Sequence, residues 1–295
     1  MAQHNEAELI PAELTHVTTE DGITHSGAVF RPTRFMREGD PVAIVWVHGG
    51  GQNFYYRSYL RIGRAVAAQG YPFLTVNTRG RDIAATVGWT TQGRLLRGSG
   101  WDLFGECVHD LAAWIGRVDS LGWPRVVLVG HSFSGWKVAY YQAHRQDGRV
   151  AGVVLASTPI RPPNMDDGYP QEVRALAEEL VAAGRGDDSL PLSRSAPVGV
   201  PRSAASLVHL GALNLDLYGR YGGEPLLGRF CAPVLAWFGS QEPRVGGRAN
   251  LEQVARLILG GRSIDTQVID GATHMYDSRE EAVAGALVQW VGVLP

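Results

Sequence analysis

The sequence predicts an α/β fold: a mostly parallel central sheet flanked by helices, with a helical cap insertion. Short runs rich in β-branched and aromatic residues alternate along the chain with longer runs of helical periodicity. One short run, Val42–Val47, is apolar at every position, as expected for a strand that is buried on both faces. The alternation fails over residues 159–229 and then resumes, which indicates an insertion into the sheet domain.

Strands and helices are expected in the order that a parallel sheet with crossover helices requires. The expected strands cover residues 27–31, 42–47, 73–76, 126–129, 150–155, 234–238 and 266–269. Helices are expected where apolar residues recur at three and four positions, at 55–69, 102–118, 136–146, 250–259 and 279–291. The residues before 27 are expected to form a polar leader, and residues 77–101, rich in Gly, Thr and Arg, a long loop.

The interruption at 159–229 is expected to be a cap, inserted between the core segments 1–158 and 230–295. It contains proline clusters and two stretches of helical character, at 171–183 and 204–217. A structureless loop of this length is uncommon in a compact domain, so a segment with its own helices is the better interpretation. Because ligands bind at the carboxyl ends of parallel strands, we expect the cap to lie over that end of the sheet.

Composition narrows the classes of partner and cofactor. The chain has 295 residues, near the upper limit for one hydrophobic core, and a net charge of -2, which predicts no nucleic-acid or membrane partner. The two cysteines, Cys107 and Cys231, are too few for a disulfide framework and lack metal-ligand spacing, so no cofactor is expected. The polar start and the lack of a long apolar run predict a cytoplasmic protein. We expect a small-molecule substrate; the oligomeric state stays open, with a homodimer among the options.

The stretch GHSFSG (130–135) lies between an expected strand and an expected helix. A sharp turn from strand to helix strains the residue at the bend and requires small residues two positions before and after it, as Gly130 and Ser134 are. Ser132 is therefore expected to present its hydroxyl as a nucleophile. The N-terminus of the following helix would supply a positive dipole end and backbone N–H groups for an oxyanion. The alternative is a serine that only caps the helix.

The strand–GHSFSG–helix unit, with HGGG upstream (48–51) and GATH late in the chain (271–274), resembles the α/β-hydrolase superfamily. The resemblance covers most of the chain from Gly27 onward, apart from the insertion. It implies an α/β-hydrolase fold and a serine hydrolase with a catalytic triad. One departure is Ser134, which replaces the last glycine of the common G-x-S-x-G pattern and is still small.

The resemblance also implies that the N–H of Gly50, helped by that of Gly51, joins the N–H of Phe133 in an oxyanion hole. Glycines let the backbone approach a substrate carbonyl closely, although an ordinary glycine turn is the alternative. His48 is expected to brace this loop rather than to act as the base. His131 is a weak candidate for the base, because the nearest neighbour on a tight turn points away from the serine.

A serine hydroxyl needs a base, and the base needs a third group that fixes its tautomer. In the superfamily the chain order is serine, acid, histidine. His274 follows the last expected strand and lies in GATH, which resembles the superfamily's histidine loop, so we expect it to be the general base. The alternative is a histidine in a surface loop.

The acid should follow the penultimate strand, which ends at Gly239. Superfamily members usually place Asp three residues after such a glycine, and here Glu242 holds that position with one extra methylene. The rival carboxylates lie in the insertion, near the histidine, or after the preceding strand. They are Asp216, Asp270, Asp277, Asp166 and Asp167.

Four residues are expected to contact the substrate: Phe54 and Tyr55, beside the glycine stretch, and His209 and Leu210, in the insertion. For the aromatic pair and for Leu210 the alternative is ordinary packing. Three stretches are similar to a group of poorly characterised intracellular hydrolases whose fungal relatives include hydrolases of ester-linked siderophores. They are HGGGQNFYYRSYLRIGRA, VNTRGRD and GHSFSGWKVAYYQA.

We therefore expect cleavage of an ester, lactone or thioester of a small organic metabolite, through an acyl-enzyme on Ser132. An acyltransferase or cyclising thioesterase would use the same triad, so the sequence leaves it open. A non-catalytic ligand-binding homologue is the alternative from a different class. Epoxide and haloalkane hydrolases need a carboxylate at the position of Ser132 and are disfavoured.

Overall fold

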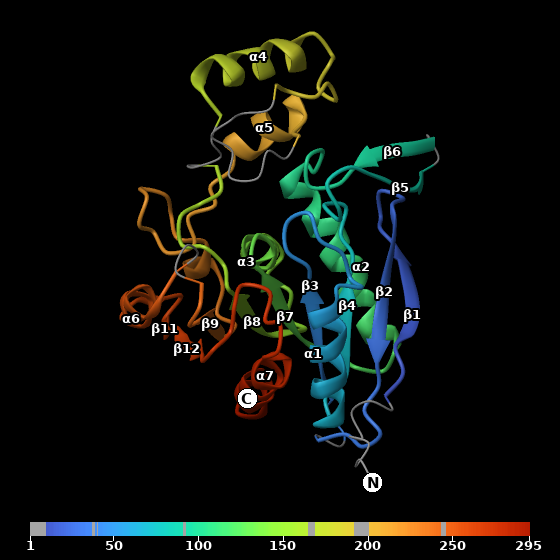
Figure 1. The fold of residues 1–295 in the computed structure, drawn as a ribbon, viewed down its shortest axis with the longest axis vertical. Helices are drawn as coiled ribbons and strands as arrows, with labels where there is room; N and C mark the ends of the chain where they lie inside the picture. Colours follow the sequence, from blue (N-terminus) through green and yellow to red (C-terminus); the bar gives the residue numbers. More distant parts are fainter. Residues whose placement is uncertain are drawn as a thin grey trace.

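The computed structural model describes residues 10–36, 39, 41–90, 93–164, 169–191, 201–242 and 246–295. An eight-stranded sheet with the strand order β1-β2-β4-β3-β7-β8-β9-β12 forms its centre. The strands β1 and β2, and β2 and β4, pair antiparallel, whereas the other neighbours run parallel. The predicted α/β class with a mostly parallel sheet is confirmed (Figure 1).

Each predicted strand is present with small shifts at its ends. The strands of the central sheet are β1 (Glu13–Thr18), β2 (Thr24–Phe30), β3 (Val42–Val47), β4 (Phe73–Val76), β7 (Arg125–His131), β8 (Val150–Ala156), β9 (Val234–Gly239) and β12 (Asp265–Ile269). Every residue of β3, β8 and β9 is buried, because helices cover both faces of the sheet.

Two parts of the sequence prediction are wrong. The segment expected to be a polar leader contains the edge strand β1. This strand buries Thr15 and Val17 and exposes its other residues. The expected loop at 77–101 contains the antiparallel hairpin of β5 (Ala85–Thr90) and β6 (Gly93–Arg97). Neither β1 nor β6 is buried on both faces, so neither has the continuous apolar run that reveals a buried strand.

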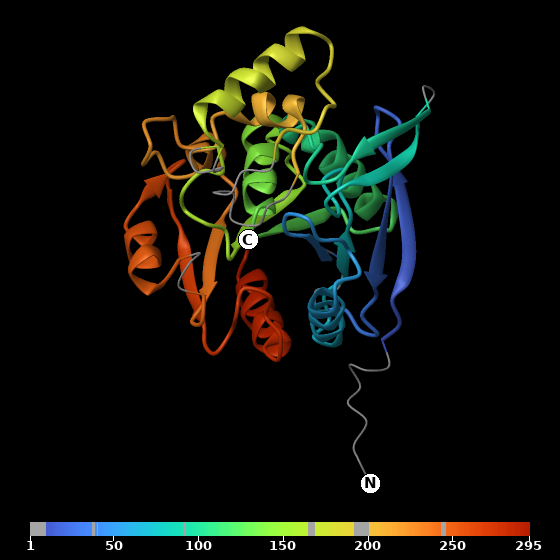
Figure 2. The same ribbon diagram turned by 45° about the horizontal axis from the view of Figure 1, so that its top comes forward.

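Helices cover the two faces of the sheet in two groups (Figure 2). On one face α1 (Arg57–Ala68) packs against α7 (Glu280–Gly292), and their buried residues share one hydrophobic cluster. The other face carries α2 (Cys107–Ser120), α3 (Ser134–Arg145) and α6 (Arg248–Ala255), which contribute to the larger cluster. The helix predicted at 250–259 ends early, because a short hairpin of β10 (Ile258–Leu259) and β11 (Arg262–Ser263) follows it.

The predicted insertion provides α4 (Gln171–Ala182) and α5 (Ala204–Gly211), which pack on each other. Figures 1 and 2 show both helices beyond the carboxyl ends of the parallel strands. The predicted helix at 204–217 ends at Gly211, and the chain then returns to the sheet layer, where Leu226 and Leu227 join the larger hydrophobic cluster. The division into core and cap stays a prediction. In the ranges that the structure describes, no helix combines the length and the apolar composition that crossing a bilayer requires.

Candidate active site

The candidate nucleophile lies on a tight turn between a strand and a helix. Ser132 directly follows β7, and its backbone is left-handed, with φ of 52°. Its N–H donates to the carbonyl oxygen of Ala156 at 2.8 Å, which fixes the turn to the neighbouring strand β8. A side chain at Gly130 would collide with the backbone of Ser134. The turn therefore requires the small residue that the sequence has there.

Three side chains from three strand ends form one hydrogen-bonded row. Nε2 of His274 lies 3.0 Å from Oγ of Ser132, and its Nδ1 lies 2.7 Å from Oε2 of Glu242. A carboxylate only accepts hydrogen bonds, so Nδ1 carries the proton of the neutral imidazole. Nε2 is then free to accept the serine proton, which is the arrangement a general base requires.

The carboxylate of Glu242 is buried, with its side chain 3% exposed. Its Oε1 accepts a hydrogen bond from Oγ of Ser157 at 2.5 Å and another from the N–H of Gly239. Donors therefore reach both oxygens of the carboxylate.

The predicted oxyanion loop lies beside the serine turn. A Cβ on Gly50 would lie 3.4 Å from Cβ of Phe133, so the two backbones face each other closely. Phe133 directly precedes α3, where backbone N–H groups have no acceptor within the helix. His48 bridges this loop to the strand beside it: Nδ1 donates to the carbonyl of Gly49 at 2.8 Å, and Nε2 accepts from the N–H of Thr78 at 3.2 Å.

The model of the "Alpha/beta hydrolase family" matches residues 44–286. The chain belongs to the α/β-hydrolase family. The match spans β3 to α7 and so includes the serine turn, Glu242 and His274.

Solved structures agree with this family membership at the level of fold. Est1E from Butyrivibrio proteoclasticus superposes with a TM-score of 0.64 at 15% identity, over 94% of this chain and 97% of that chain. A carboxyl esterase from Bacillus coagulans reaches 0.66 at 15% identity, over 97% and 99%. The esterase domain of a Rhodothermus marinus protein reaches 0.58 at 17% identity, over 96% and 98%. The α/β-hydrolase fold implied by the sequence is thus confirmed.

A curated relative matches only locally. Over 71 residues the chain is 34% identical to the "Uncharacterized peptidase YuxL" of Bacillus subtilis (strain 168). This stretch spans 24% of the hydrolase and 11% of that relative.

The rival carboxylates of this α/β hydrolase lie elsewhere. Asp216 caps its own loop, where it accepts hydrogen bonds from the N–H groups of residues 218, 220 and 221. Asp270 pairs with the hydroxyl of Ser240 at 3.3 Å, and Asp277 is exposed. Among the acids in the described ranges, Glu242 is the one that the structure brings to His274. Asp166 and Asp167 lie outside the described residues.

His131 has a role that the sequence did not reveal. Its Nε2–H donates to the backbone carbonyl of His274 at 2.8 Å, and its Nδ1 lies 2.7 Å from Oη of Tyr59. Burial, with a further contribution from the nearby His274, lowers the pKa of His131 to about 3. The ring is therefore neutral at physiological pH and links the nucleophile's strand to the loop of the base. Long-range contacts of this kind carry no local sequence signal.

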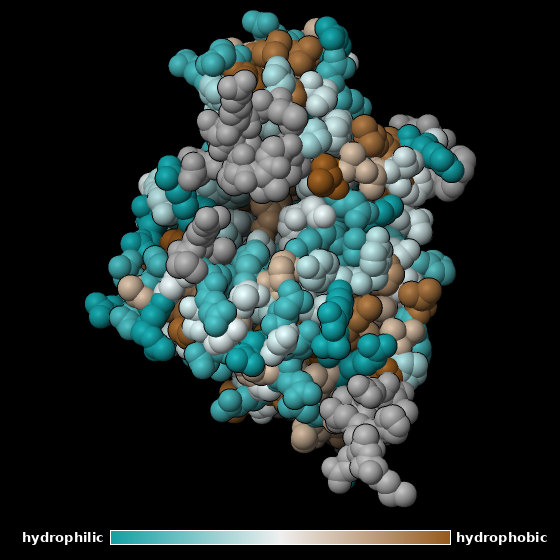
Figure 3. All heavy atoms as spheres, viewed as in Figure 1, coloured by the Kyte–Doolittle hydropathy of each residue, from teal (hydrophilic) through white to brown (hydrophobic). Residues whose placement is uncertain are grey.

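The four predicted substrate contacts have mixed surroundings. Tyr55 is 57% exposed and its ring packs edge-on against Phe54, which is partly buried against the core. Nε2 of His209 accepts a hydrogen bond from the N–H of Gly105 at 3.0 Å, and Leu210 is buried in the larger hydrophobic cluster. Figure 3 shows a hollow in the surface between the part with α4 and α5 and the sheet layer. Contact of these four residues with substrate stays a prediction.

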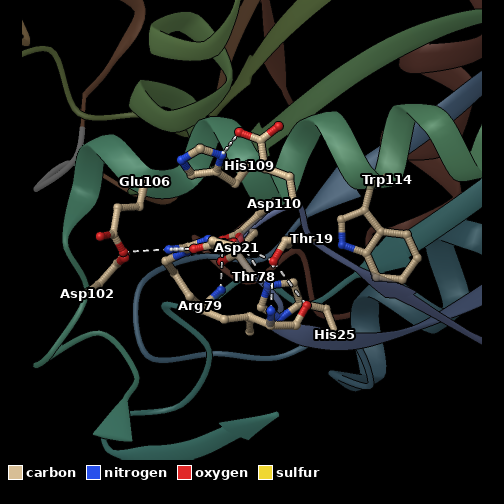
Figure 4. Close-up of polar contacts among 12 residues, drawn as sticks. Thr19, Asp21, His25, Thr78, Arg79, Asp102, Glu106, His109, Asp110 and Trp114 are labelled. Atoms are coloured by element: carbon tan, nitrogen blue, oxygen red, sulfur yellow. Dashed lines mark hydrogen bonds and ion pairs between the residues drawn. The ribbon is translucent and has the colours of Figure 1, made fainter. Parts of the chain in front are cut away.

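A second cluster of charged side chains is buried around Arg79 (Figure 4). The guanidinium has no exposed area and pairs with Asp21 at 3.0 Å, Glu106 at 2.5 Å and Asp110 at 2.9 Å. His25 also contacts Asp110, at 2.9 Å. Burial alone would raise the pKa of Asp110, but His25 and Arg79 hold it well below its usual range. The cluster joins the β1–β2 turn, the loop after β4 and the start of α2.

Lys137 is the only lysine of the hydrolase and lies one turn into α3. It pairs with Asp102, and the two side chains are 2% and 5% exposed. Its Nζ lies 5.9 Å from the ring centres of both Phe104 and Phe133. The buried pair thus packs against the residue that follows the nucleophile. Within the described ranges, no group of three or more His, Cys, Asp or Glu is arranged to hold a metal ion.

Proposed function

We propose that this α/β hydrolase cleaves an ester, lactone or thioester of a small organic metabolite through an acyl-enzyme on Ser132. One observation carries the proposal: the unbroken row from the Ser132 hydroxyl through the His274 ring to the buried Glu242 carboxylate. The alternatives were a surface-loop histidine and a serine that only caps the helix. Neither would require a serine, a histidine and a carboxylate to be hydrogen-bonded in this order, with the proton on Nδ1 of the histidine.

The chemistry follows from the row. His274 takes the proton of Ser132 as Oγ attacks the carbonyl carbon, and Glu242 stabilises the imidazolium that forms. The N–H groups of Gly50, Gly51 and Phe133 would then donate to the oxyanion. His274 returns the proton to the leaving oxygen or sulfur, and the acyl group stays on Ser132. A water molecule, activated by the same ring, releases the acid in the second half of the reaction.

The similar solved structures support an ester as the bond that is cleaved, whereas the short curated match is to a protein described as a peptidase. The structures from Bacillus coagulans and Rhodothermus marinus are described as a carboxyl esterase and an esterase domain, and Est1E from Butyrivibrio proteoclasticus was also solved with ferulic acid bound. The similarity to hydrolases of ester-linked siderophores, stated above, favours an ester or lactone of a specialised metabolite as well.

We also propose that residues 159–229 cap the site and shape its pocket. The position of α4 and α5 beyond the carboxyl ends of the strands supports this role, since substrates of α/β folds bind at that edge. The small substrate and the cytoplasmic location belong to the same proposal, in which the chain needs no cofactor.

A fluorophosphonate probe and a series of short p-nitrophenyl esters, lactones and thioesters test the proposal. We expect one covalent adduct, located on the peptide with Ser132 by mass spectrometry. Ser132→Ala should lose the adduct and lower kcat at least ~10³-fold. Ser120→Ala, an exposed serine at the end of α2, is the matched control and should behave as the wild type. An adduct that survives in Ser132→Ala, or turnover that does not change, would overturn the proposal.

Adding alcohols and amines to the same reactions separates hydrolysis from acyl transfer. Free acid as the main product supports the hydrolase, because water then wins the acyl group. Quantitative transfer of the acyl group to an added alcohol or amine would instead support the acyltransferase. Quantitative transfer to the substrate's own hydroxyl would support the cyclising thioesterase.

A further inference from the structure

We propose that Ser157 and Tyr276 are positioning residues for catalysis, which act by holding the carboxylate of Glu242 in register with His274. This inference rests on the proposed function, because it requires Glu242 to be the acid of the triad.

Three hydrogen-bond donors in series end on one carboxylate oxygen. The Nε1–H of Trp237, which can only donate, donates to Oη of Tyr276 at 3.0 Å. The Tyr276 hydroxyl donates to Oγ of Ser157 at 2.6 Å, and the Ser157 hydroxyl donates to Oε1 of Glu242 at 2.5 Å. Each hydroxyl accepts one bond and donates the next, so the bonds polarise one another toward the carboxylate.

This chain decides where the other oxygen of Glu242 points. The terminal torsion of a glutamate is broad, so a carboxylate without partners at Oε1 samples many orientations. Here Ser157 and the N–H of Gly239 both hold Oε1, and Oε2 is left facing Nδ1 of His274. The hydroxyl chain therefore adds a second constraint, beside the N–H of Gly239, on the direction in which the imidazole meets its acceptor.

Water cannot substitute for the chain, because its members are buried. Ser157, Trp237 and Tyr276 have no exposed area, and Glu242 is 5% exposed. Burial raises the pKa of Tyr276 well above its usual value, and the charge of Glu242 adds to this rise. The phenol therefore stays protonated and keeps donating. Without the Ser157 hydroxyl, Oε1 of Glu242 would keep only the N–H of Gly239 as a donor, and the buried charge would lose part of its hydrogen bonding.

The backbone at both hydroxyl residues adopts an uncommon conformation. Ser157 has φ of 51° and Tyr276 has φ of 62°, in the left-handed region that non-glycine residues rarely occupy. Ser157 lies at the end of β8 and Tyr276 two residues after His274, so the chain reaches Glu242 from two separate segments. Strained residues that meet at one side chain indicate a constraint on that side chain, and such residues cluster at active sites.

Steady-state kinetics on an ester that the wild type hydrolyses test the inference. We expect Ser157→Ala to lower kcat roughly ten- to hundredfold and Tyr276→Phe roughly three- to tenfold, with KM unchanged, because the loss appears in the charged transition state. Tyr141→Phe is the matched control. Its hydroxyl donates to Asp147 at 2.8 Å in a buried part of α3, and its loss should leave kcat unchanged.

A double-mutant cycle distinguishes positioning from a general loss of structure. Once Glu242→Ala has removed the carboxylate, Ser157 has nothing left to hold, so adding Ser157→Ala should lower kcat by less than about twofold. Losses that multiply would overturn the inference. Ser157→Gly removes the hydroxyl and relieves the left-handed backbone, so its kcat should be as low as that of Ser157→Ala; wild-type kcat in Ser157→Gly would also overturn it.

Fluorophosphonate titration counts the folded active sites in each variant, and kcat is expressed per labelled site. If Ser157→Ala does not fold, the kcat of Tyr276→Phe decides whether the inference holds, because this substitution removes only one oxygen atom. A wild type that neither turns over esters nor takes the probe overturns the proposed function and this inference together. An active wild type with an unaffected Tyr276→Phe overturns this inference alone.

Discussion

The ring of His131 donates from Nε2 to the backbone carbonyl of His274 at 2.8 Å, so the neighbour of Ser132 holds the loop that carries His274. The other ring nitrogen faces Oη of Tyr59 at 2.7 Å, and both residues are buried. The residue before Ser132 thereby ties the serine turn to the loop that carries His274. Four predictions follow from this site and from the clusters around it.

The first prediction concerns pH and stability. The pKa of His131 is about 3 in the folded chain, against an ordinary value of 6.5. Between these values the unfolded chain takes up a proton that the folded chain does not, so acid favours unfolding. We expect the free energy of unfolding to fall below pH 6.5, by up to about 1.4 kcal/mol per pH unit from this group. Above pH 6.5 its contribution is complete.

Urea denaturation at pH 7, 6 and 5 measures this slope. His131→Gln should be less stable at pH 7, and the difference from the wild type should shrink toward pH 5, because the variant has no such proton uptake. Burial likewise lowers the pKa of His48, to about 4, so His48→Gln should show the same trend over a narrower range. If the free energy of unfolding changed with pH by the same slope in His131→Gln and in the wild type, the prediction would be contradicted.

The second prediction concerns the charge and the side-chain length of Glu242, the acid of the proposed triad. Glu242→Gln should lower kcat by ~10³-fold or more, because the amide can present a donor to Nδ1 and removes the charge that stabilises the imidazolium. Glu242→Asp keeps the charge but shortens the side chain, so it should lose contact with His274 or with Ser157 and lower kcat about ten- to hundredfold. Asp270→Asn, the exposed rival acid, should retain wild-type kinetics. Loss of activity in Asp270→Asn instead would mean that Glu242 is not the acid.

The third prediction concerns the serine turn. A Cβ at Gly130 would collide with the carbonyl of Ser134, which is backbone and cannot move aside. Gly130→Ala should therefore lower the free energy of unfolding by about 3 kcal/mol or more. Gly116 lies exposed within α2 with nothing within 4 Å of its Cβ position, so Gly116→Ala should stabilise by about 0.5–1 kcal/mol. Equal and small effects in thermal melts would show that the turn tolerates a side chain.

The fourth prediction concerns the cluster around Arg79. Arg79→Met removes one of the two side-chain partners of the fully buried Asp110 carboxylate and leaves His25 as the other, so it should destabilise the fold by about 3–5 kcal/mol. Arg185→Met breaks the exposed pair with Asp188, where the side chains are 64% and 42% exposed, and should cost less than about 1 kcal/mol. Chemical denaturation of both variants at neutral pH gives the comparison. A loss below 1 kcal/mol in Arg79→Met would show that Asp110 finds other partners.

The central sheet and the row of three side chains could be predicted because their signals are local. Buried parallel strands such as β3 are apolar throughout, and Ser132, Glu242 and His274 each lie within five residues of a strand's end, with a recognisable flank. The parts that could not be predicted depend on distant contacts. Tyr276 and Ser157 are separated by 119 residues, and Arg79 and Asp110 by 31. No periodicity or spacing encodes such pairs.

The missed strands have a different cause. β1 lies at the edge of the sheet and pairs only with β2, so polar side chains occupy its exposed face. The hairpin of β5 and β6 forms a sheet of its own outside the core. The amino-acid composition of β1 and of this hairpin therefore resembles that of a loop, although β1 does alternate buried and exposed positions.

Ser132, Ser157 and Tyr276 share a left-handed backbone within one hydrogen-bonded neighbourhood. Three of the six non-glycine residues with positive φ in the described ranges thus lie where the proposed chemistry happens. Selection for heat tolerance in the laboratory would meet a conflict at these positions: glycine at 157 or 276 relaxes the backbone and removes a hydroxyl that Glu242 depends on. Heat-resistant descendants that stay active should therefore carry their changes elsewhere, for example along the exposed side of α2.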